Sequence, residues 1–202
     1  MSEVKKIGLL DVTPFNPLVI KSHYDFNWNE LKPICRNLIN TSPGQTDLEH
    51  NDGKSSSTNP QTPHTIYQFN SFYKWLNPMV EHIITNEWGY DPRLRYGVVQ
   101  SWVNVHNKTG LTAEHAHGAA IMVVATYLNL PKDGGFIQFK DPMEYPKNFH
   151  QRVSLDWMWQ EVPAITGDVL MFPGWLLHRT QPSNSDEERW VLTTNIGIVG
   201  IK

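Results

Sequence analysis

Apolar positions recur at helical spacing in the middle of the chain. Between residues 70 and 84 they are Phe72, Trp75, Leu76, Met79, Val80, Ile83 and Ile84. This pattern predicts an amphipathic helix with one apolar face. Pro78 lies inside it, so either the helix kinks there or a new helix begins with Asn77 as its cap. A shorter helix is expected over residues 29–39, and it begins a few residues later if Pro33 occupies its first turn.

After residue 96 the pattern becomes that of short strands separated by turn residues. We expect strands over residues 96–105, 119–128, 136–139, 169–172, 175–180 and 189–201, with turns at Lys108-Thr109-Gly110 and Pro173-Gly174. A further strand is expected within residues 7–20, where prolines restrict it to a sheet edge. The prediction is a mainly β fold, an antiparallel barrel or sandwich with an N-terminal helical layer. It forms one domain over residues 1–202, with helical support over about 1–95 and a core barrel over about 96–202.

Two stretches have the composition of loops. Residues 40–63 contain almost no apolar side chain, which indicates either a mobile loop or a lid over a cleft. Residues 143–159 form an aromatic and charged insertion. Because binding specificity is often carried by loops, both are candidates for substrate contacts.

Composition narrows the class of protein. A chain of 202 residues with a net charge of −3 gives no basic footprint for nucleic acid. Its charged start lacks the apolar core of a signal peptide, and no apolar run approaches the length of a membrane span. Cys35 is the single cysteine, so no intrachain disulfide forms and a reducing, cytoplasmic setting is expected. The oligomeric state is left open, with a homodimer as one option.

Two histidines, His115 and His117, precede the apolar run of residues 119–128. If that run is a strand that begins with them, side chains two residues apart project from the same face. Two neutral imidazoles at short range suit a divalent transition metal such as iron, copper or zinc. The alternative is a pair of surface histidines, because a chain with nine histidines often contains such a pair by chance.

A third histidine, His178, follows 63 residues after His115, with several expected strands between them. In a jelly roll, strands that are distant in sequence lie side by side, so the three histidines can meet at its mouth. Arg189 begins the last expected strand, 11 residues after His178. An inward-facing arginine is a natural bidentate partner for a carboxylate. The alternative, which composition favours, is a surface charge beside Glu187 and Glu188.

Six segments together carry a resemblance to a known superfamily. They are Trp102-Val103-Asn104, His115-Ala116-His117-Gly118, Tyr127 to Pro131, Gly167 to Pro173, His178, and Arg189 to Asn195. In this order they resemble the 2-oxoglutarate/Fe(II) oxygenases, most of all a bacterial and phage branch of unknown substrate related to the prolyl hydroxylases. The resemblance covers residues 96–198 and is most specific from Gly167 to Arg189.

The resemblance implies a double-stranded β-helix, or jelly roll, that holds one Fe(II) ion at its open end. The superfamily's metal ligands are a His-x-Asp/Glu pair and a distal histidine, which map to His115, His117 and His178. His117 stands where most of the superfamily has a carboxylate, although a histidine is common in the similar branch. Glu114 is not expected to replace it, because adjacent strand residues face opposite sides. Asp141 is a minor candidate for a carboxylate ligand.

The resemblance also implies 2-oxoglutarate and O2 as further components of the site, with Arg189 holding the distal carboxylate of 2-oxoglutarate. The expected activity is hydroxylation of an aliphatic C–H bond in a small-molecule or peptidyl substrate, with release of succinate and CO2. Family members usually supply a supporting hydroxyl two residues after the arginine, but this chain has Val191 there. Tyr127 or Thr193 is therefore expected to supply it, with a core tyrosine as the alternative for Tyr127. Further residues expected around the pocket are Asn104, Trp102 and Trp175, with plain packing as the alternative for Asn104 and Trp102. No site role is expected for His23, His64, His82, His106 or His150.

Two other functions are compatible with the same residues. A cupin-type three-histidine protein would bind the metal without using 2-oxoglutarate. Cupins normally carry a glutamate four or five residues after the pair, where this chain has apolar residues. A non-enzymatic β-sandwich would use the many tryptophans to bind a ligand such as a carbohydrate, but it would leave the histidine spacing to chance.

Overall fold

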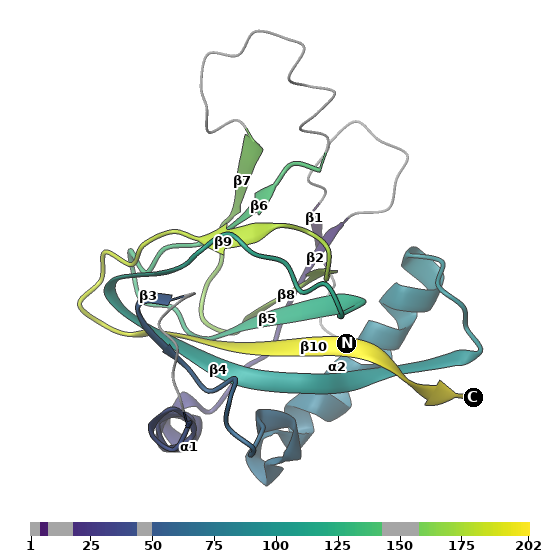
Figure 1. Ribbon diagram of the computed structural model, residues 1–202, viewed down its shortest axis with the longest axis horizontal. Coiled ribbons are helices and arrows are strands. Elements are labelled where there is room, and N and C mark those ends of the chain that lie inside the picture. The colour runs from purple at the N-terminus through teal and green to yellow at the C-terminus, as the bar shows by residue number, and fades with distance from the viewer. Residues whose placement is uncertain (1–4, 8–17, 44–49, 143–157) are drawn as a thin grey trace, which may run out of the picture.

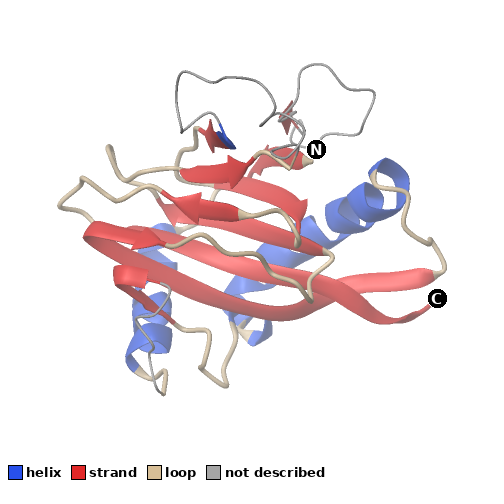
Figure 2. Ribbon diagram, turned by 45° about the horizontal axis from the view of Figure 1, so that its top comes forward, coloured by secondary structure: helices blue, strands red, loops and turns tan. Residues whose placement is uncertain are grey.

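Two antiparallel β-sheets pack against each other in the computed structural model, and two helices cover the outer face of the larger sheet (Figure 1, Figure 2). The structure describes residues 5–7, 18–43, 50–142 and 158–202. The larger sheet has the strand order β1-β2-β8-β5-β10-β4-β3, and the smaller sheet has the order β7-β6-β9. The predicted mainly β jelly roll with a helical layer is therefore confirmed.

The elements have the following bounds. The strands are β1 (Lys5–Ile7), β2 (Val19–His23), β3 (His50–Ser55), β4 (Leu94–Thr112), β5 (Met122–Asn129), β6 (Ile137–Lys140), β7 (Trp159–Val162), β8 (Asp168–Pro173), β9 (His178–Thr180) and β10 (Arg189–Ile201). The helices are α1 (Trp28–Asn40), α2 (Asn70–His82), and the short turns η1 (Pro63–Thr65), η2 (Tyr67–Phe69) and η3 (Ile83–Glu87).

Strand β5 lies between two hydrophobic cores, which explains why its sequence is a continuous apolar run. Its side chains alternate between the two sheet faces. Val123, Ala125 and Tyr127 pack against the smaller sheet, whereas Met122, Val124 and Leu128 pack against the helical side. The strand begins at Met122 and not at residue 119, so His115 and His117 precede it and are not part of it.

The two predicted helices are present, but each runs through its proline. The sequence predicts that Pro33 lies in the first turn of its helix. Helix α1 begins at Trp28, so Pro33 lies in the second turn instead. Pro33 is exposed, so the carbonyl that loses its helical partner can be hydrated. Helix α2 is continuous from Asn70 to His82 with Pro78 inside, so no new helix begins at Asn77. Packing of the apolar faces outweighs the local cost of both prolines.

The polar stretch of residues 40–63 is not a long loop in its described part. Residues 50–55 form β3, which pairs with the edge of β4. The chain stays attached after the strand, since the Ser56 amide donates to the Val103 carbonyl at 2.9 Å and the Ser56 hydroxyl accepts from the Val103 amide. Residues 50–55 are therefore an edge strand and not part of a loop. The strand forms through backbone hydrogen bonds, which the hydropathy of the sequence does not report.

Two further strand predictions change at their ends. The predicted turn at Lys108-Thr109-Gly110 lies inside the single long strand β4, where Thr109 has a positive φ of 70°. After Pro173-Gly174, the chain does not continue in the same sheet. It crosses to β9 of the smaller sheet, which begins only at His178.

The first half of the chain also contributes to the large sheet. Strands β2 and β3 pair with β8 and β4, so the helical support and the barrel share one sheet. Most of the strand predicted within residues 7–20, and nearly all of the insertion at 143–159, lie outside the described residues. None of the helices in the described part has the length and apolar character needed to cross a bilayer.

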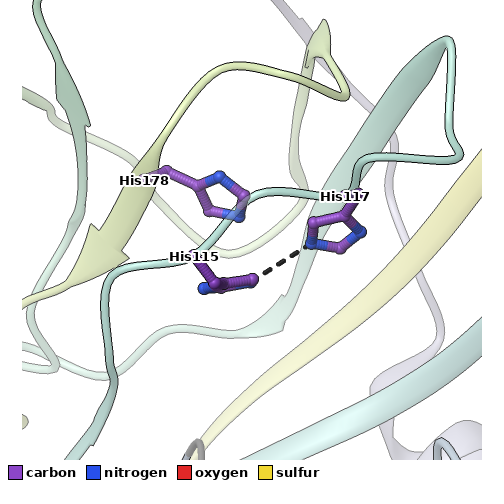
Figure 3. A group of neighbouring side chains, drawn as sticks. All are labelled: His115, His117 and His178. Atoms are coloured by element: carbon purple, nitrogen blue, oxygen red, sulfur yellow. Dashed lines mark hydrogen bonds between the residues drawn. The ribbon is translucent and has the colours of Figure 1, made fainter.

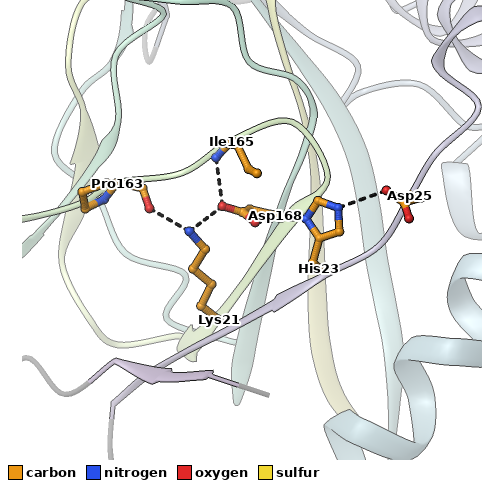
Figure 4. A network of polar contacts seen from close by, with 6 residues as sticks. All are labelled: Lys21, His23, Asp25, Pro163, Ile165 and Asp168. Atoms are coloured by element: carbon orange, nitrogen blue, oxygen red, sulfur yellow. Dashed lines mark hydrogen bonds and ion pairs between the residues drawn. The ribbon is translucent and has the colours of Figure 1, made fainter. Parts of the chain in front are cut away.

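A polar cluster joins β2 to the turn before β8 (Figure 4). Asp168 is buried and accepts hydrogen bonds from the Ile165 amide at 2.9 Å and the Lys21 ammonium at 2.5 Å. The second oxygen of Asp168 contacts His23 Nδ1 at 3.2 Å, and Asp25 contacts the other ring nitrogen at 3.1 Å. The hydrogen bond with Asp168, followed by the contact with Asp25, raises the pKa of His23 above its ordinary 6.5.

This cluster predicts that His23 contributes to stability mainly in mildly acidic solution. Because the pKa of His23 is raised in the folded state, its contribution is complete below about 6.5 and is lost as the pH rises through the folded-state pKa. The free energy of unfolding of the native chain minus that of His23→Gln should therefore decrease between about pH 5.5 and about pH 8. Urea denaturation of both proteins across this range measures the difference. A difference that is constant, or that grows with pH, would contradict the assignment.

Candidate metal centre

Backbone pairing, more than strand alternation, brings the three candidate histidines together. His115 and His178 form an isolated antiparallel bridge, in which each amide donates to the other's carbonyl at 3.0 Å. His117 is fixed from the opposite side, since its amide donates to the Gly174 carbonyl at 2.8 Å. The three imidazoles point toward one another (Figure 3), and one ligand nitrogen from each lies within 4.8 Å of the other two.

The turn at Gly174 explains why a glycine is needed between β8 and β9. A Cβ atom at this position would lie 2.0 Å from the Ala120 carbonyl oxygen and 2.8 Å from that of His117. These distances are far shorter than van der Waals contact. The turn can therefore pass close to the His117 segment only with glycine there.

A hydrogen bond orients each imidazole through its Nδ1 atom. His115 donates to the Ala113 carbonyl at 2.8 Å, and His178 donates to the Leu176 carbonyl at 2.9 Å. His117 Nδ1 lies 2.7 Å from the Asn195 side-chain oxygen, which assigns that ring atom as the donor. In this tautomer, Nε2 is the ring nitrogen through which each histidine would bind a metal.

The distances between ring nitrogens fit a bound cation. His117 Nε2 lies 3.2 Å from His115 Nε2, the contact drawn as a dashed line in Figure 3. Two lone pairs at this separation repel each other unless a proton or a metal ion lies between them. Burial, with His115 and His117 nearby, lowers the pKa of His178 to about 3, so the ring is neutral and able to bind a metal at physiological pH.

Aromatic side chains enclose the group. Trp102 stacks on His117 with ring centroids 5.7 Å apart and an interplanar angle of 14°. Phe172 packs edge-to-face against His178, with ring centroids 4.8 Å apart. These contacts restrict the rotation of the rings and reduce the access of water to the metal position. Trp175, expected in the pocket wall, is 52% exposed and does not line the cavity.

The histidines lie at the mouth of a cavity of about 320 Å³. Of the residues predicted for the pocket, Trp102, Asn104, Tyr127 and Thr193 line it. Asn104 Nδ2 donates to the Thr193 hydroxyl at 3.3 Å, and the amide oxygen of Asn104 has no hydrogen-bond partner among the described residues. The Tyr127 hydroxyl accepts the Ile137 amide at 3.2 Å, and burial raises its pKa to about 12, so it stays protonated.

Arg189 lies behind the cavity and is completely buried, so the prediction of a surface charge is wrong. Its guanidinium donates to the carbonyl oxygens of Gly134, Gly135, Gln181 and Gly110, at 2.6, 3.3, 3.0 and 3.4 Å respectively. Arg189 Nη2 also donates to the Thr180 hydroxyl at 3.0 Å. Burial lowers the pKa of Arg189 below its ordinary value, yet an arginine remains charged in proteins. Its connection with the cavity therefore passes through Thr180, which lines it.

His106 and Thr180 are among the lining residues that were not predicted from the sequence. His106 is buried, and its Nε2 lies 2.9 Å from the Thr112 hydroxyl. The signal was available, because His106 follows Asn104 by two residues on the same strand and therefore shares its face. Thr180 likewise follows His178 by two residues on β9 and shares its face.

The candidate carboxylates do not join the metal group. Asp141 is buried but is not one of the three residues whose ligand atoms converge. Glu114 points away and lies 3.4 Å from the Lys140 ammonium. His64, His82 and His23 contact Ser101, Asn86 and Asp168 away from the group, and His150 lies outside the described residues.

Asn195 is expected to tune metal affinity through His117. Because partners of ligand histidines typically change metal affinity about 10- to 100-fold, Asn195→Leu should weaken Fe(II) binding by a factor in that range. Asn195→Asp keeps the acceptor and should bind at least as tightly as the native chain. Anaerobic titration of Fe(II) into each protein measures the constants. Native affinity in Asn195→Leu would show that the contact does not orient the ring.

This fold and its three histidines define a jelly-roll protein with a group able to hold a metal ion at the mouth of its cavity. Comparison with known families gives the more specific result. Residues 100–195 match the family model described as "Putative 2OG-Fe(II) oxygenase". No curated protein sequence matches the chain.

Solved structures of the same fold are distant in sequence. HygX from Streptomyces hygroscopicus, crystallised with nickel and 2-oxoglutarate, aligns with a TM-score of 0.60 and 12% identity over 90% of this chain and 83% of its own. A prolyl-4-hydroxylase from Pseudomonas putida aligns with a TM-score of 0.59 and 13% identity over 89% and 91%. SnoN, an α-ketoglutarate-dependent epimerase of nogalamycin biosynthesis, aligns with a TM-score of 0.61 and 11% identity over 89% and 77%.

The resemblance to the 2-oxoglutarate/Fe(II) oxygenases is therefore confirmed. The chain has the jelly-roll fold of that superfamily, and the matched segment contains all three histidines. The family match and the fold support an oxidoreductase. The related folds include an epimerase as well as a hydroxylase, so the fold alone does not define the reaction.

Proposed function

We propose that this chain is a non-haem Fe(II) and 2-oxoglutarate-dependent dioxygenase that hydroxylates an aliphatic C–H bond of a small-molecule or peptidyl substrate. One observation carries the proposal: one ligand nitrogen from each of three imidazoles lies within 4.8 Å of the other two, in a cavity that is also lined by hydroxyl and amide groups. This arrangement suits a metal that shares its coordination with a bound ligand.

His115, His117 and His178 would hold the iron through their Nε2 atoms. Bound iron with 2-oxoglutarate supplies the activation of O2, coupled to oxidative decarboxylation of the cosubstrate to succinate and CO2. Three neutral imidazoles leave the charge of the ion uncompensated, so the site favours an anionic ligand more than a site with a carboxylate would. A histidine binds a metal only in its deprotonated form, so metal affinity should fall in acid.

The cavity residues would position the cosubstrate. Val123, Ala125 and Ile137 give it apolar walls, which suit the methylene groups of 2-oxoglutarate. Asn104 and Thr193 lie between the histidines and the deeper residues along the strands, because Thr193 and Asn195 are two positions apart on β10. The small residues Ala116, Gly118 and Ala119 at the rim leave room for a substrate side chain near the metal.

Anaerobic spectroscopy tests the use of 2-oxoglutarate directly. Addition of Fe(II) and then 2-oxoglutarate should produce a weak visible charge-transfer absorption band, since the cosubstrate would bind the iron through its keto acid. His178→Ala should show no band. A native protein that binds Fe(II) but gives no band with 2-oxoglutarate would instead be the cupin-type metal protein. One that binds neither would be a non-enzymatic module.

The reaction itself is tested by its products. Succinate release should rise when the correct substrate is included in a panel of peptides and metabolites, and prolyl peptides are the first to test because a prolyl-4-hydroxylase is among the related folds. Mass spectrometry should find one added oxygen atom, derived from O2, in the product. A product of unchanged mass, or one that has lost two hydrogen atoms, would indicate epimerisation or ring closure.

A further inference from the structure

Two strands of the large sheet extend beyond their neighbours. Strand β5 pairs with β10 only as far as Ile196, and β3 pairs with β4 only from Asn104 onward. Residues 94–99 of β4 and 197–201 of β10 therefore form a two-stranded ribbon, with no further strand on either side among the described residues. Figure 2 shows this β4–β10 ribbon running on to the C-terminus past the rest of the sheet. Its outer backbone groups are open to water or to another strand.

Exposed apolar side chains gather on the ribbon. The described part of the chain has nine large apolar side chains that are exposed, and five of them lie on or against the ribbon: Tyr90, Val99, Ile198, Val199 and Ile201. Ile201 is 76% exposed, and Tyr90 reaches the ribbon through an edge-to-face contact with Tyr96, with ring centroids 6.5 Å apart. Single exposed apolar residues need no explanation, but a cluster of this kind marks a surface that binds another molecule.

The free edge of β10 also lacks the charges that usually prevent strand pairing. Natural proteins protect exposed sheet edges with charged residues or proline. The edge strands β3, β7 and β9 follow this rule, since they carry Lys54, Glu161 and Arg179. The β4 side of the ribbon carries the exposed Arg95. In β10, by contrast, residues 190–201 include no charged side chain. The edge of β10 is therefore suited to pair with another strand.

The chemistry of this edge fits a second copy of the same chain. In an antiparallel pair related by a two-fold axis, each strand offers the other the same set of amide and carbonyl groups. A copy of this edge is therefore complementary to it in hydrogen bonding, and its apolar side chains meet apolar side chains. An uncharged, apolar patch is also the composition found at the centre of homodimer interfaces.

The pairing brings no like charges together. Val199 is the middle residue of 197–201, and Lys202, three residues further on, is the nearest charged residue along the strand. If the axis passes Val199, each Lys202 lies about 10 Å from it, at about 3.3 Å per residue. The two lysines are then about 20 Å apart, roughly twice the Debye length at 0.1 M ionic strength. Each is also paired within its own chain, with the Glu81 carboxylate 2.5 Å from its ammonium group.

We propose that residues 197–201 pair antiparallel with the same residues of a second copy and form a homodimer, in which the two ribbons join into one four-stranded sheet. A stable dimer buries about 800 Å² on each partner. A strand pair of this length covers only part of that area. The exposed side chains of Tyr90, Val99 and Ile201 supply the remainder of the interface.

The dimer would place the partner beside the candidate metal centre. The Ile196 carbonyl, just before the paired residues, accepts the Ile121 amide at 2.9 Å, and the neighbouring Gly118 and Ala119 line the mouth of the cavity. The end of the partner subunit's β10 would therefore lie next to this rim. The inference does not depend on the proposed function, because it uses neither the metal nor a cosubstrate.

Sedimentation equilibrium of the full chain measures the oligomeric state. The native chain should have twice the mass of one 23.3 kDa chain at micromolar concentration. Val199→Lys places a lysine of each copy at the axis, so it should raise the dissociation constant of the dimer at least about 100-fold. Val199 is exposed, so the variant should fold, which circular dichroism verifies. If it does not fold, Ile201→Lys introduces the same charge at the most exposed residue of the edge.

A charge-reversed variant tests the symmetry. Val199→Glu should also be monomeric, but an equimolar mixture with Val199→Lys should form a dimer with one copy of each, because residue 199 of one copy faces residue 199 of the other. Ile165→Lys is the matched control. Ile165 is exposed and lies in the turn before β8, at the end of β5 that is remote from the ribbon, so this variant should remain dimeric.

Each outcome bears on the inference. A native chain that is monomeric throughout the micromolar range would overturn it and would leave the edge to a peptide or a different protein. A dimer that persists unchanged in Val199→Lys and Ile201→Lys would place the interface elsewhere and would overturn it as well. Lysine and glutamate variants that are monomeric but do not combine would overturn the symmetric pairing. Loss of the dimer in each variant, with recovery in the mixture, supports it.

Discussion

Replacing His178 by alanine is expected to abolish metal binding while the fold is retained. His178 is 5% exposed and, of the three candidate ligands, is the one that lies on a strand. Its pairing with His115 uses backbone atoms that alanine also has. Because partners of ligands alone change metal affinity about 10- to 100-fold, the loss of a ligand should exceed that range. Anaerobic Fe(II) titration measures affinity, and circular dichroism measures the fold.

A matched histidine outside the group provides the control. His82 lies at the end of α2 and contacts Asn86 at 3.0 Å, away from the cavity. His82→Ala should bind Fe(II) as the native chain does. If His178→Ala and the native chain bound Fe(II) equally, the metal would have to lie elsewhere, and the proposed oxygenase chemistry would lose its centre.

His117 stands where most of the superfamily has a carboxylate, and its contacts indicate whether it is suited to bind the metal there. Its Nδ1 donates to Asn195 and its ring stacks on Trp102, so the ring is held at both an edge and a face. The remaining nitrogen faces the other two ligands. A histidine that was only replacing a lost carboxylate would have no reason to be oriented in this way. The arrangement therefore favours a three-histidine metal site in which the ligands contribute no charge.

The sequence was most informative where side-chain chemistry and periodicity agree. The helical spacing from Phe72 to Ile84, the apolar run of β5 and the turn at Pro173-Gly174 all report local preferences, and each is found in the structure. The sequence predicted that the three histidines lie together, because histidine is uncommon and its metal-binding chemistry is specific. The reason given for their convergence was incomplete, since His115 and His117 precede the strand expected to hold them.

Features that depend on backbone pairing could not be predicted in the same way. Strand β3 has no apolar pattern and exists because the edge of β4 offers backbone partners. The burial of Arg189 depends on carbonyl groups from three separate segments, which no local pattern reveals. Thr180 lines the cavity because the chain crosses to the smaller sheet after Gly174, where β9 forms one wall.

Removal of the Arg189 side-chain charge is expected to destabilise the fold strongly, before any effect on a ligand. In Arg189→Met, the carbonyl oxygens of Gly134 and Gln181 lose a charged donor at a buried position. Each buried acceptor that is left without its partner typically costs about 1–3 kcal/mol. Arg189→Lys should also be destabilising, because one ammonium group cannot reproduce the planar fork of the guanidinium. Urea denaturation, with the slope m compared between proteins, measures the loss.

Arg179, on the neighbouring strand β9, is the appropriate comparison. Its guanidinium lies 4.1 Å from the centre of the Trp159 ring and donates to Gln138, but it is only partly buried. Arg179→Met should therefore cost about 1 kcal/mol or less. Equal losses in the two variants would mean that the contacts of Arg189 with the backbone contribute little. A large loss confined to Arg189 would show that its contacts with the backbone stabilise the fold. Reduced activity of an Arg189 variant would then reflect unfolding as well as any effect on a ligand.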